Sequence, residues 1–482
     1  MKHIFLVFIF ITTSLWAQNY DKNWLKVIEY ENEGKIKSAN EIVSKIHQKA
    51  SRDKNEVQMI KCFFYESKYL QVLDEDAQTK IINNLKTEIN NASVPSKAIL
   101  NFVYAKCLID YQKQNYYLLF NRTNTVSFDD QFLTWTSKDI SEQINRALEK
   151  TLLDEAILKQ TSLSNYLLIF DYNDEDKTKK DNLFNYLLKE NIALLTPQIA
   201  HWEVQKKEFL SFEKELLGNS ASFLQLNFDF VKNEKLKKVL ELYQKQERNV
   251  PDLENQFDRI QFCTRVLLDS DETFMKSLNA IQRESKDLIL TQKIQLEKAV
   301  ILNNLASKEI HPDYNIKAVA TLDSIISINN RSNTHKLALQ KKQNISSKSL
   351  NIQLQKFSYT DENTRAFIRY KNLNRLSVSF FKIDQNTTKD FRNSPYNKDS
   401  LVSAIIKDKK PIASKNYELE KKNNYFEYST EVLLPPLKTG SYLVYFESDS
   451  DIKNTKAFAY ETITVSNIAV LTSENDKKEN YQ

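Results

Sequence analysis

The spacing of apolar residues changes character within this chain. Between residues 20 and 330 they recur every three or four positions, which is the period of an amphipathic helix. In the stretch Ser349–Phe357 they alternate with polar residues, as at Leu350, Ile352 and Leu354, which is typical of a half-buried strand. The sequence therefore predicts a helical part followed by a β part.

The start of the helical part predicts a pair of helices. Trp24 lies on the apolar face of the first helix, Gly34 breaks that helix, and a second apolar stripe runs from Ile36 to Ile46. Helix, glycine turn and helix predict an αα-hairpin like one tetratricopeptide-type repeat, in which the small residue Ala39 lets the two helices approach. Because no strict period follows, we expect an irregular helical-repeat array over residues 18–330. Further helices are predicted at Glu56–Leu73, Ala77–Asn90, Ser96–Tyr111, Lys138–Leu153, Leu183–Leu195, Pro197–Leu217, Lys235–Lys245, Leu253–Leu268, Asp271–Glu284, Leu288–Leu305 and Tyr314–Ile328.

The β part predicts an antiparallel sandwich over residues 349–470. Its short alternating segments are separated by turn signals, among them the pair Pro435-Pro436 and the turn residue Gly440. The polar stretch 331–348 before it is interpreted as a linker, and 471–482 as a polar tail. Strands are expected at Ser349–Phe357, Thr364–Tyr370, Leu376–Ile383, Tyr425–Leu433, Ser441–Glu447 and Phe458–Val465.

Residues 1–17 have the order of a secretory signal peptide. Lys2 gives a positive start, Ile4–Ile11 is an apolar run, and Ala17 is a small residue where signal peptidase cuts. A membrane span needs about 20 apolar residues, which no segment provides. No cysteine follows the run, so a lipoprotein is not expected. The interpretation is a soluble exported protein, periplasmic or secreted; a buried N-terminal helix is the alternative.

Composition excludes several classes of function. Only 3 glycines occur, too few for the glycine-rich loops that bind phosphates. The 68 Lys and Arg residues are interspersed with 63 Asp and Glu residues, which does not indicate a nucleic-acid-binding face. Aromatic pairs are expected to fill core in the helices, as at Tyr116-Tyr117, and to fit the pleated surface in the strands, as at Phe380-Phe381.

No catalytic, cofactor-binding or metal-ligating residue is predicted, and we expect a non-enzymatic protein without a cofactor or small-molecule substrate. The histidines lack metal-ligand spacing and are interpreted as surface or packing residues. The acidic runs are interpreted as solvated loops or helix starts. The three cysteines do not form a disulfide framework and are interpreted as small buried apolar residues, although a Cys62–Cys107 bridge stays open. The residues considered are His47, His201, His311, His335, Asp74-Glu75-Asp76, Asp129-Asp130, Asp174-Glu175-Asp176, Cys62, Cys107 and Cys263.

A series of short blocks follows in a fixed order. The blocks are Asn19–Trp24, Glu33–Ala39, Glu66–Tyr69, Phe120–Thr123, Thr134–Trp135, Gln160–Leu163, Tyr370–Leu373, Leu437–Tyr442 and Ile463–Ala469. In this order they resemble the large α2-macroglobulin-like proteins exported by Bacteroidetes-type bacteria. The resemblance covers nearly the whole chain after residue 17.

The resemblance implies a macroglobulin-type sandwich at 349–470, a helical docking platform before it, and a link to endopeptidase inhibition. Family members are several times longer and carry a bait segment, and many have a Cys-Gly-Glu-Gln thioester. None of the three cysteines here is followed by Gly-Glu-Gln, so covalent trapping is not expected. We expect the N-terminal part of such an inhibitor, or a shortened relative, because the end at Asn480–Gln482 reads as cut mid-protein. The alternative is a helical-repeat scaffold that binds envelope proteins.

Overall fold

The computed structural model describes residues 20–123, 132–170, 181–199, 207–328, 332–393, 398–420, 422–449, 456–468, 472–475 and 478–481. The predicted signal peptide, residues 1–17, lies outside the described residues. The chain forms two compact units, 1–273 and 274–482. In the described part of the chain, no helix is both long and apolar enough to cross a membrane.

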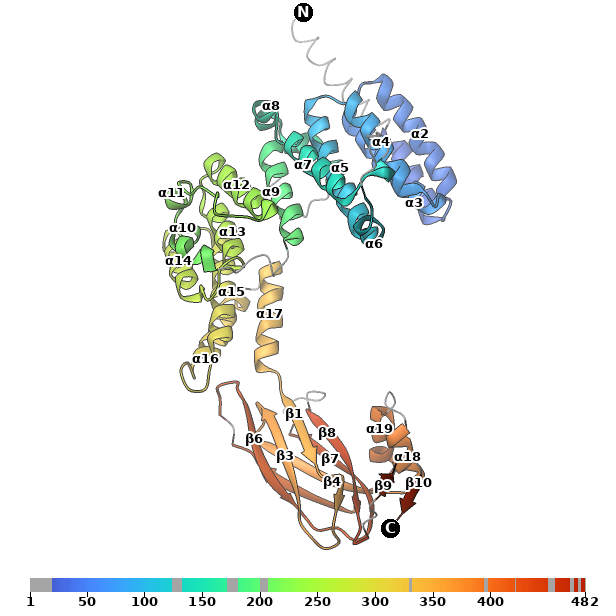
Figure 1. Cartoon of the computed structure of the whole chain (residues 1–482), viewed down its shortest axis with the longest axis vertical. Helices are drawn as coiled ribbons and strands as arrows, with labels where there is room; N and C mark the ends of the chain where they lie inside the picture. Colours follow the sequence, from blue (N-terminus) through green and yellow to red (C-terminus); the bar gives the residue numbers. More distant parts are fainter. Residues whose placement is uncertain are drawn as a thin grey trace, which may run out of the picture. The chain divides into compact units, whose positions relative to one another are not determined.

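Unit 1 is helical and begins with the predicted hairpin (Figure 1). Residues 20–32 form the first helix, Gly34 takes a positive φ of 71° in the turn, and α2 (Ile36–Arg52) follows. Trp24 and the fully buried Ala39 belong to one apolar cluster, as the small residue at this position predicts. The Trp24 indole N–H also donates to a side chain of the next helix, α3 (Glu56–Leu73), so a hydrogen bond adds to the apolar packing.

The longer helices that follow lie where the apolar periodicity predicts them, whereas the short helices α6 (Tyr116–Phe120), α8 (Glu155–Gln160) and α11 (Ser220–Phe223) were not predicted. The Thr136 side chain caps α7 (Ser137–Lys150) as one half of a capping box. Proline at the start of α5 is likewise in its favoured position. The helices of unit 1 are α3 (Glu56–Leu73), α4 (Ala77–Asn91), α5 (Val94–Gln114), α6 (Tyr116–Phe120), α7 (Ser137–Lys150), α8 (Glu155–Gln160), α9 (Leu183–Leu195), α10 (Glu213–Leu216), α11 (Ser220–Phe223), α12 (Glu234–Asn249) and α13 (Leu253–Thr264).

The helix predicted over Pro197–Leu217 is wrong. The described residues there form short 3-10 turns (Thr196–Gln198 and Lys207–Phe212) and then α10; residues 200–206 are outside the described part. A long-range contact fixes this path. The Arg259 side chain of α13 donates to the backbone carbonyls of Leu216 and Gly218, and forms a fully buried ion pair with Glu247 of α12 at 2.7 Å.

Unit 2 contains helices as well as the sandwich, so the boundary predicted near residue 330 is not where the structure divides. It holds most of α14 (Asp271–Glu284), and α15 (Leu288–Leu305), α16 (Tyr314–Ile326) and α17 (Asn333–Ser346). The last three share one apolar cluster, against which Tyr425 of the β part also packs. The Asn315 amide donates to the Asn424 carbonyl, and Lys308 lies over the Tyr428 ring. These contacts join the helices to the sandwich.

The polar stretch 331–348, predicted as a linker, contains α17 instead. Its Ser332 side chain accepts from the backbone N–H of His335, which caps the helix start. Ala338 and Ile345 are buried against α15 and α16. These two residues lie at helical spacing, and their packing orders α17 although most of its other residues are polar.

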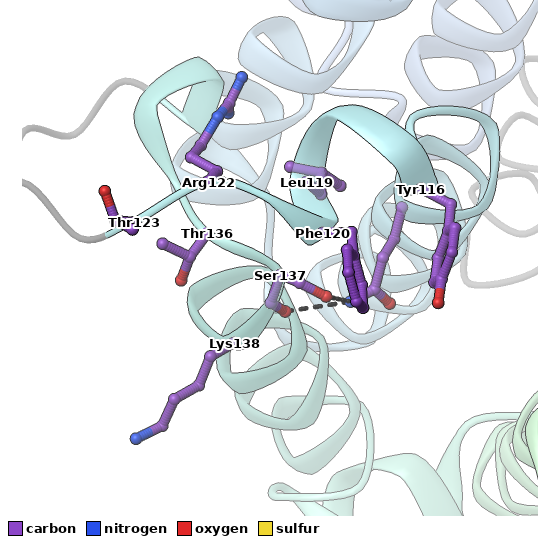
Figure 2. A pocket seen from close by; sticks show the side chains of 9 residues that line it. Tyr116, Leu119, Phe120, Arg122, Thr123, Thr136, Ser137 and Lys138 are labelled. Atoms are coloured by element: carbon purple, nitrogen blue, oxygen red, sulfur yellow. Dashed lines mark hydrogen bonds between the residues drawn. The ribbon is translucent and has the colours of Figure 1, made fainter.

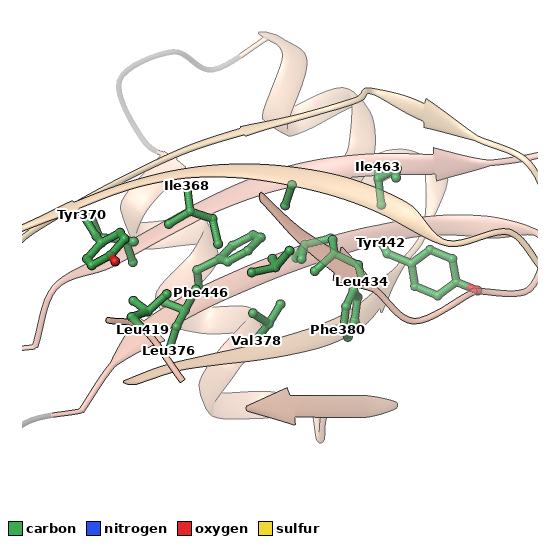
Figure 3. Packing of buried hydrophobic residues seen from close by; sticks show 14 of the residues in the cluster. Ile368, Tyr370, Leu376, Val378, Phe380, Leu419, Leu434, Tyr442, Phe446 and Ile463 are labelled. Atoms are coloured by element: carbon green, nitrogen blue, oxygen red, sulfur yellow. The ribbon is translucent and has the colours of Figure 1, made fainter. Parts of the chain in front are cut away.

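Two sheets face each other across one apolar core, which confirms the sandwich (Figure 3). One sheet has the order β1-β3-β6 and is antiparallel; the other is β2-β8-β7-β4-β5, antiparallel except for the β2–β8 pair. Ile368 of the first sheet and Phe380 and Phe446 of the second are fully buried between them. The strands are β1 (Ser349–Leu354), β2 (Phe357–Ser358), β3 (Thr364–Lys371), β4 (Arg375–Ile383), β5 (Ala413–Glu418), β6 (Glu427–Leu434), β7 (Gly440–Ser448) and β8 (Phe458–Val465).

A helical insertion covers the outer face of the second sheet. Between β4 and β5 the chain forms α18 (Gln385–Asn393) and α19 (Lys398–Asp408), which the sequence did not predict. Phe381 points away from the sandwich core because successive strand residues face opposite sides, and it packs with Phe391 and Val402 of these helices. The predicted polar tail at 471–482 also differs, because β9 (Thr472–Asn475) and β10 (Lys478–Tyr481) pair antiparallel there.

The buried ion pair gives a direct test of the unit 1 fold. Arg259→Met leaves the Glu247 carboxylate buried without its partner, and we expect it to lower the free energy of unfolding by about 3–5 kcal/mol. Every tryptophan after Trp16 lies in unit 1, so tryptophan fluorescence during urea unfolding reports on this unit. The double variant Arg259→Met/Glu247→Met should recover much of the loss. Arg52→Met, an exposed control, should change stability by less than about 0.5 kcal/mol. A loss below about 1 kcal/mol for Arg259→Met would contradict this account.

Candidate functional site

The short helix α6 exposes almost all of its apolar side chains. Leu119 is buried, but Tyr116, Tyr117, Leu118 and Phe120 are 56%, 86%, 68% and 71% exposed. In this helix of little more than one turn, only Leu119 is buried. We call the four exposed side chains the α6 surface. The expectation that Tyr116 and Tyr117 fill a core is wrong, whereas Phe380 and Phe381 lie in a strand and are buried on its two faces.

A pocket of about 420 Å³ lies beside this surface, between α5, α6 and the start of α7 (Figure 2). Its walls are held together by the Gln112 amide, which donates to the Ser137 carbonyl and to the hydroxyls of Ser137 and Ser141, each at 3.0 Å. The pocket is lined by Gln112, Tyr116, Leu119, Phe120, Arg122, Thr123, Thr136, Ser137 and Lys138. Two of these, Tyr116 and Phe120, also belong to the α6 surface, so surface and pocket are continuous.

The rim of this pocket is positively charged. The Arg122 guanidinium donates to the carbonyls of Leu133 and Trp135, which holds it in place. Lys138, which also lines the pocket, forms no ion pair within the described residues. Exposed aromatic side chains next to an arginine have the composition of the core of a protein-binding surface, which a polar rim surrounds.

The start of α7 does not offer a free anion site. The Asp139 carboxylate accepts from the Thr136 hydroxyl at 2.7 Å and from its backbone N–H at 2.9 Å. These hydrogen bonds lower the pKa of Asp139, so the helix N-terminus already has its negative partner. The lining of the pocket thus combines apolar side chains, hydroxyl groups and the positive charges of Arg122 and Lys138.

The histidines considered in the sequence do not converge. His47 of α2 lies 3.3 Å from the Glu66 carboxylate of α3, and His311 stacks on the Tyr314 ring. His335 is buried in α17, and its Nδ1 has no hydrogen-bond partner among the described residues. His201 lies outside the described part of the chain. Over the ranges that the structure describes, no three histidine, cysteine or acidic side chains cluster as metal ligands do.

The acidic runs and the cysteines also lie apart from the pocket. Asp74 pairs with Lys80 in an exposed loop, and Asp76 precedes α4; the runs at 129–130 and 174–176 lie outside the described residues. All three cysteines are free thiols, so Cys62 and Cys107 are not bridged in this structure. Burial raises the pKa of Cys107 to about 11 and that of Cys263 to about 12, which keeps both protonated and unreactive.

No protein-family model matches the sequence, and no curated protein matches it. Function is therefore inferred from the chain's own residues.

The His47–Glu66 pair predicts a pH dependence of stability. The hydrogen bond to Glu66 and its negative charge, with a further contribution from Glu88, raise the pKa of His47, although burial opposes this. Because the raised pKa belongs to the folded state, the pair stabilises the protein fully below the ordinary histidine pKa of about 6.5. That stabilisation is lost as the pH rises through the folded-state value. We expect the urea stability of the wild type to exceed that of His47→Gln by more at about pH 6 than at about pH 9. An excess that is equal at both pH values, or larger at the higher, would contradict the assignment.

Proposed function

We propose that this chain is a non-enzymatic binding protein whose helical unit docks a partner protein through the α6 surface. The exposed Tyr116, Tyr117 and Phe120 carry the proposal. Tyrosine and phenylalanine bury large areas at low entropic cost, which is why they concentrate in interfaces. A cluster of exposed apolar side chains next to a pocket is typical of a binding site.

The positive charge around this surface determines which charge the partner should carry. Arg122 and Lys138 line the pocket together with Tyr116 and Phe120, so the partner should present apolar side chains flanked by Asp or Glu. Opposite charges at the rim of an interface mainly raise the association rate. Binding should therefore slow when the salt concentration rises, because salt screens exposed charges.

The sequence resemblance makes the proposal more specific. The ordered blocks that are similar to α2-macroglobulin-like proteins, together with the predicted signal at 1–17, support an exported protein linked to peptidase inhibition. In this more specific version of the proposal, the partner is a peptidase, and the two-sheet domain corresponds to a macroglobulin-type sandwich. The second candidate is a scaffold for envelope proteins, which the same α6 surface supports equally. Both are binding functions that need no catalytic residue.

Capture experiments with surface variants test the docking proposal. We expect the chain from Gln18 to capture a defined partner from the source organism's envelope extract, and Tyr117→Ser/Phe120→Ser to reduce that capture at least about tenfold, since truncated interface aromatics often contribute about 2 kcal/mol each. The matched control Leu25→Ser/Val72→Ser replaces two other exposed apolar residues of unit 1, 67% and 66% exposed. It should leave capture unchanged. Equal losses for both variants would contradict a role for α6.

A panel of purified peptidases separates the two candidates. If the partner is a peptidase, the chain from Gln18 should form a complex by gel filtration with at least one of them and slow its cleavage of a large protein substrate. Tyr117→Ser/Phe120→Ser should weaken that complex. Absence of any complex and of any slowing would remove autonomous peptidase inhibition and leave the scaffold.

A further inference from the structure

A second pocket of about 380 Å³ lies elsewhere in unit 1, where the end of α7 and the turn after it meet α8, α9 and α12. It shares no lining residue with the pocket beside α6. Its apolar wall consists of Leu148, Leu152, Leu153, Leu195 and Leu242. Four of these are buried, but Leu153 is 74% exposed, so the pocket has an apolar lip open to solvent. We call it the Asn191 pocket.

One neutral polar side chain, Asn191, lies in the lining of this pocket, and it has an unused acceptor. Asn191 is 1% exposed, and its Nδ2 donates to the Thr151 hydroxyl at 2.7 Å. That hydroxyl in turn donates to the Leu148 carbonyl at 2.6 Å. Because the only hydroxyl proton of Thr151 is used, Thr151 can only accept from Asn191, and this fixes the orientation of the amide. The Asn191 Oδ1 then has no hydrogen-bond partner among the described residues.

An orphaned acceptor of this kind needs a donor. Buried polar atoms in proteins almost always have a hydrogen-bond partner, and the exceptions concentrate at functional sites. A ligand that enters the Asn191 pocket should therefore bring an N–H or O–H group together with an apolar body. The volume is at the small end of the range of about 300–1,000 Å³ found for ligand pockets.

Most charged side chains at the rim are paired. Lys238 pairs with Glu149 at 3.6 Å, and Glu155 pairs with Lys245 at 3.1 Å and with Lys159 at 2.6 Å. Glu241, the third acidic residue of the lining, is exposed and forms no ion pair within the described residues. Its carboxylate is available to a positive group that lies at the mouth of the pocket.

We propose that the Asn191 pocket binds a peptide segment of a partner protein, in which an apolar side chain is followed or preceded by Lys or Arg. The apolar side chain lies against Leu152, Leu153 and Leu242. A backbone N–H of the segment donates to Asn191 Oδ1, and the basic side chain pairs with Glu241. A peptide provides all three groups within two adjacent residues, which matches the size of the pocket. This site is independent of the α6 surface and takes a ligand of opposite charge.

Selection from a library of random twelve-residue peptides displayed on phage tests the site. The chain from Gln18 is the target, and the affinity of the most enriched peptide is then measured by fluorescence polarisation. We expect the enriched peptides to share Leu, Ile, Met or Phe next to Lys or Arg. No shared motif of this kind would overturn the proposal.

Substitutions at exposed positions test where the peptide binds without risk to the fold. Leu153→Asp and Glu241→Lys should each weaken binding at least about tenfold, which corresponds to 1.4 kcal/mol. The matched controls Leu25→Asp and Glu41→Lys change an exposed leucine and an exposed glutamate outside the pocket and should leave the affinity unchanged. Tyr117→Ser should also leave it unchanged, which separates this site from the α6 surface. Equal effects of pocket and control substitutions would overturn the assignment.

Asn191→Leu tests the hydrogen bond. It should weaken peptide binding several-fold while the variant still unfolds cooperatively by tryptophan fluorescence. The Glu241→Lys variant, in which Asn191 is unchanged, should no longer prefer peptides that contain Lys or Arg. It should still prefer peptides that contain the apolar residue. An unchanged affinity in Asn191→Leu would show that no ligand N–H bonds to Oδ1 and would overturn that part of the proposal.

Discussion

The buried ion pair between Arg259 and Glu247 is the interaction on which unit 1 depends most. Both side chains are fully removed from solvent, where two charges depend on their mutual contact and on further hydrogen bonds. Arg259 also donates to the carbonyls of Leu216 and Gly218 and lies over the Phe223 ring, whereas the Glu247 Oε2 has no hydrogen-bond partner among the described residues. A glycine is required at 218, since a Cβ there would lie 2.5 Å from the Lys214 carbonyl oxygen. One arginine thus ties α13, α12 and an irregular segment into one body.

The same pair helps to position a binding pocket. Lys238 precedes Glu247 by nine residues, which places the two on opposite sides of α12 at about 100° per residue. One side of α12 is therefore anchored to α13, and the other lines the Asn191 pocket with Lys238, Leu242 and Lys245. A rigid helix with one buried charged side and one open side is a suitable support for a site, because its anchored side fixes where the open side lies.

Much of this fold could be predicted from local pattern. The bounds of α3, α9, α14 and α15 agree with the apolar periodicity, and the alternating strands β3, β4 and β8 were placed to within a residue or so. These elements bury one regular face against a neighbour, so the pattern along the chain contains the information. The elements that were missed take their structure from distant contacts. The path around Leu216 depends on Arg259, and α17 is ordered by packing on α15 and α16.

The candidate sites were harder to predict than the fold. A run of five apolar residues at Tyr116–Phe120 is typical of a buried segment, and only the shortness of α6 leaves four of them exposed. The Asn191 pocket draws on α7, α9 and α12, which are far apart in sequence, so no local motif marks it.

The central claim is that the α6 surface contacts a partner protein in the living cell. Site-specific photo-cross-linking measures this directly, with a benzophenone amino acid in place of Tyr117 in the source organism. We expect a light-dependent cross-link from position 117 to one defined protein, and none from Leu25, which is also exposed. The absence of any cross-link at 117, or the same products from both positions, would contradict it.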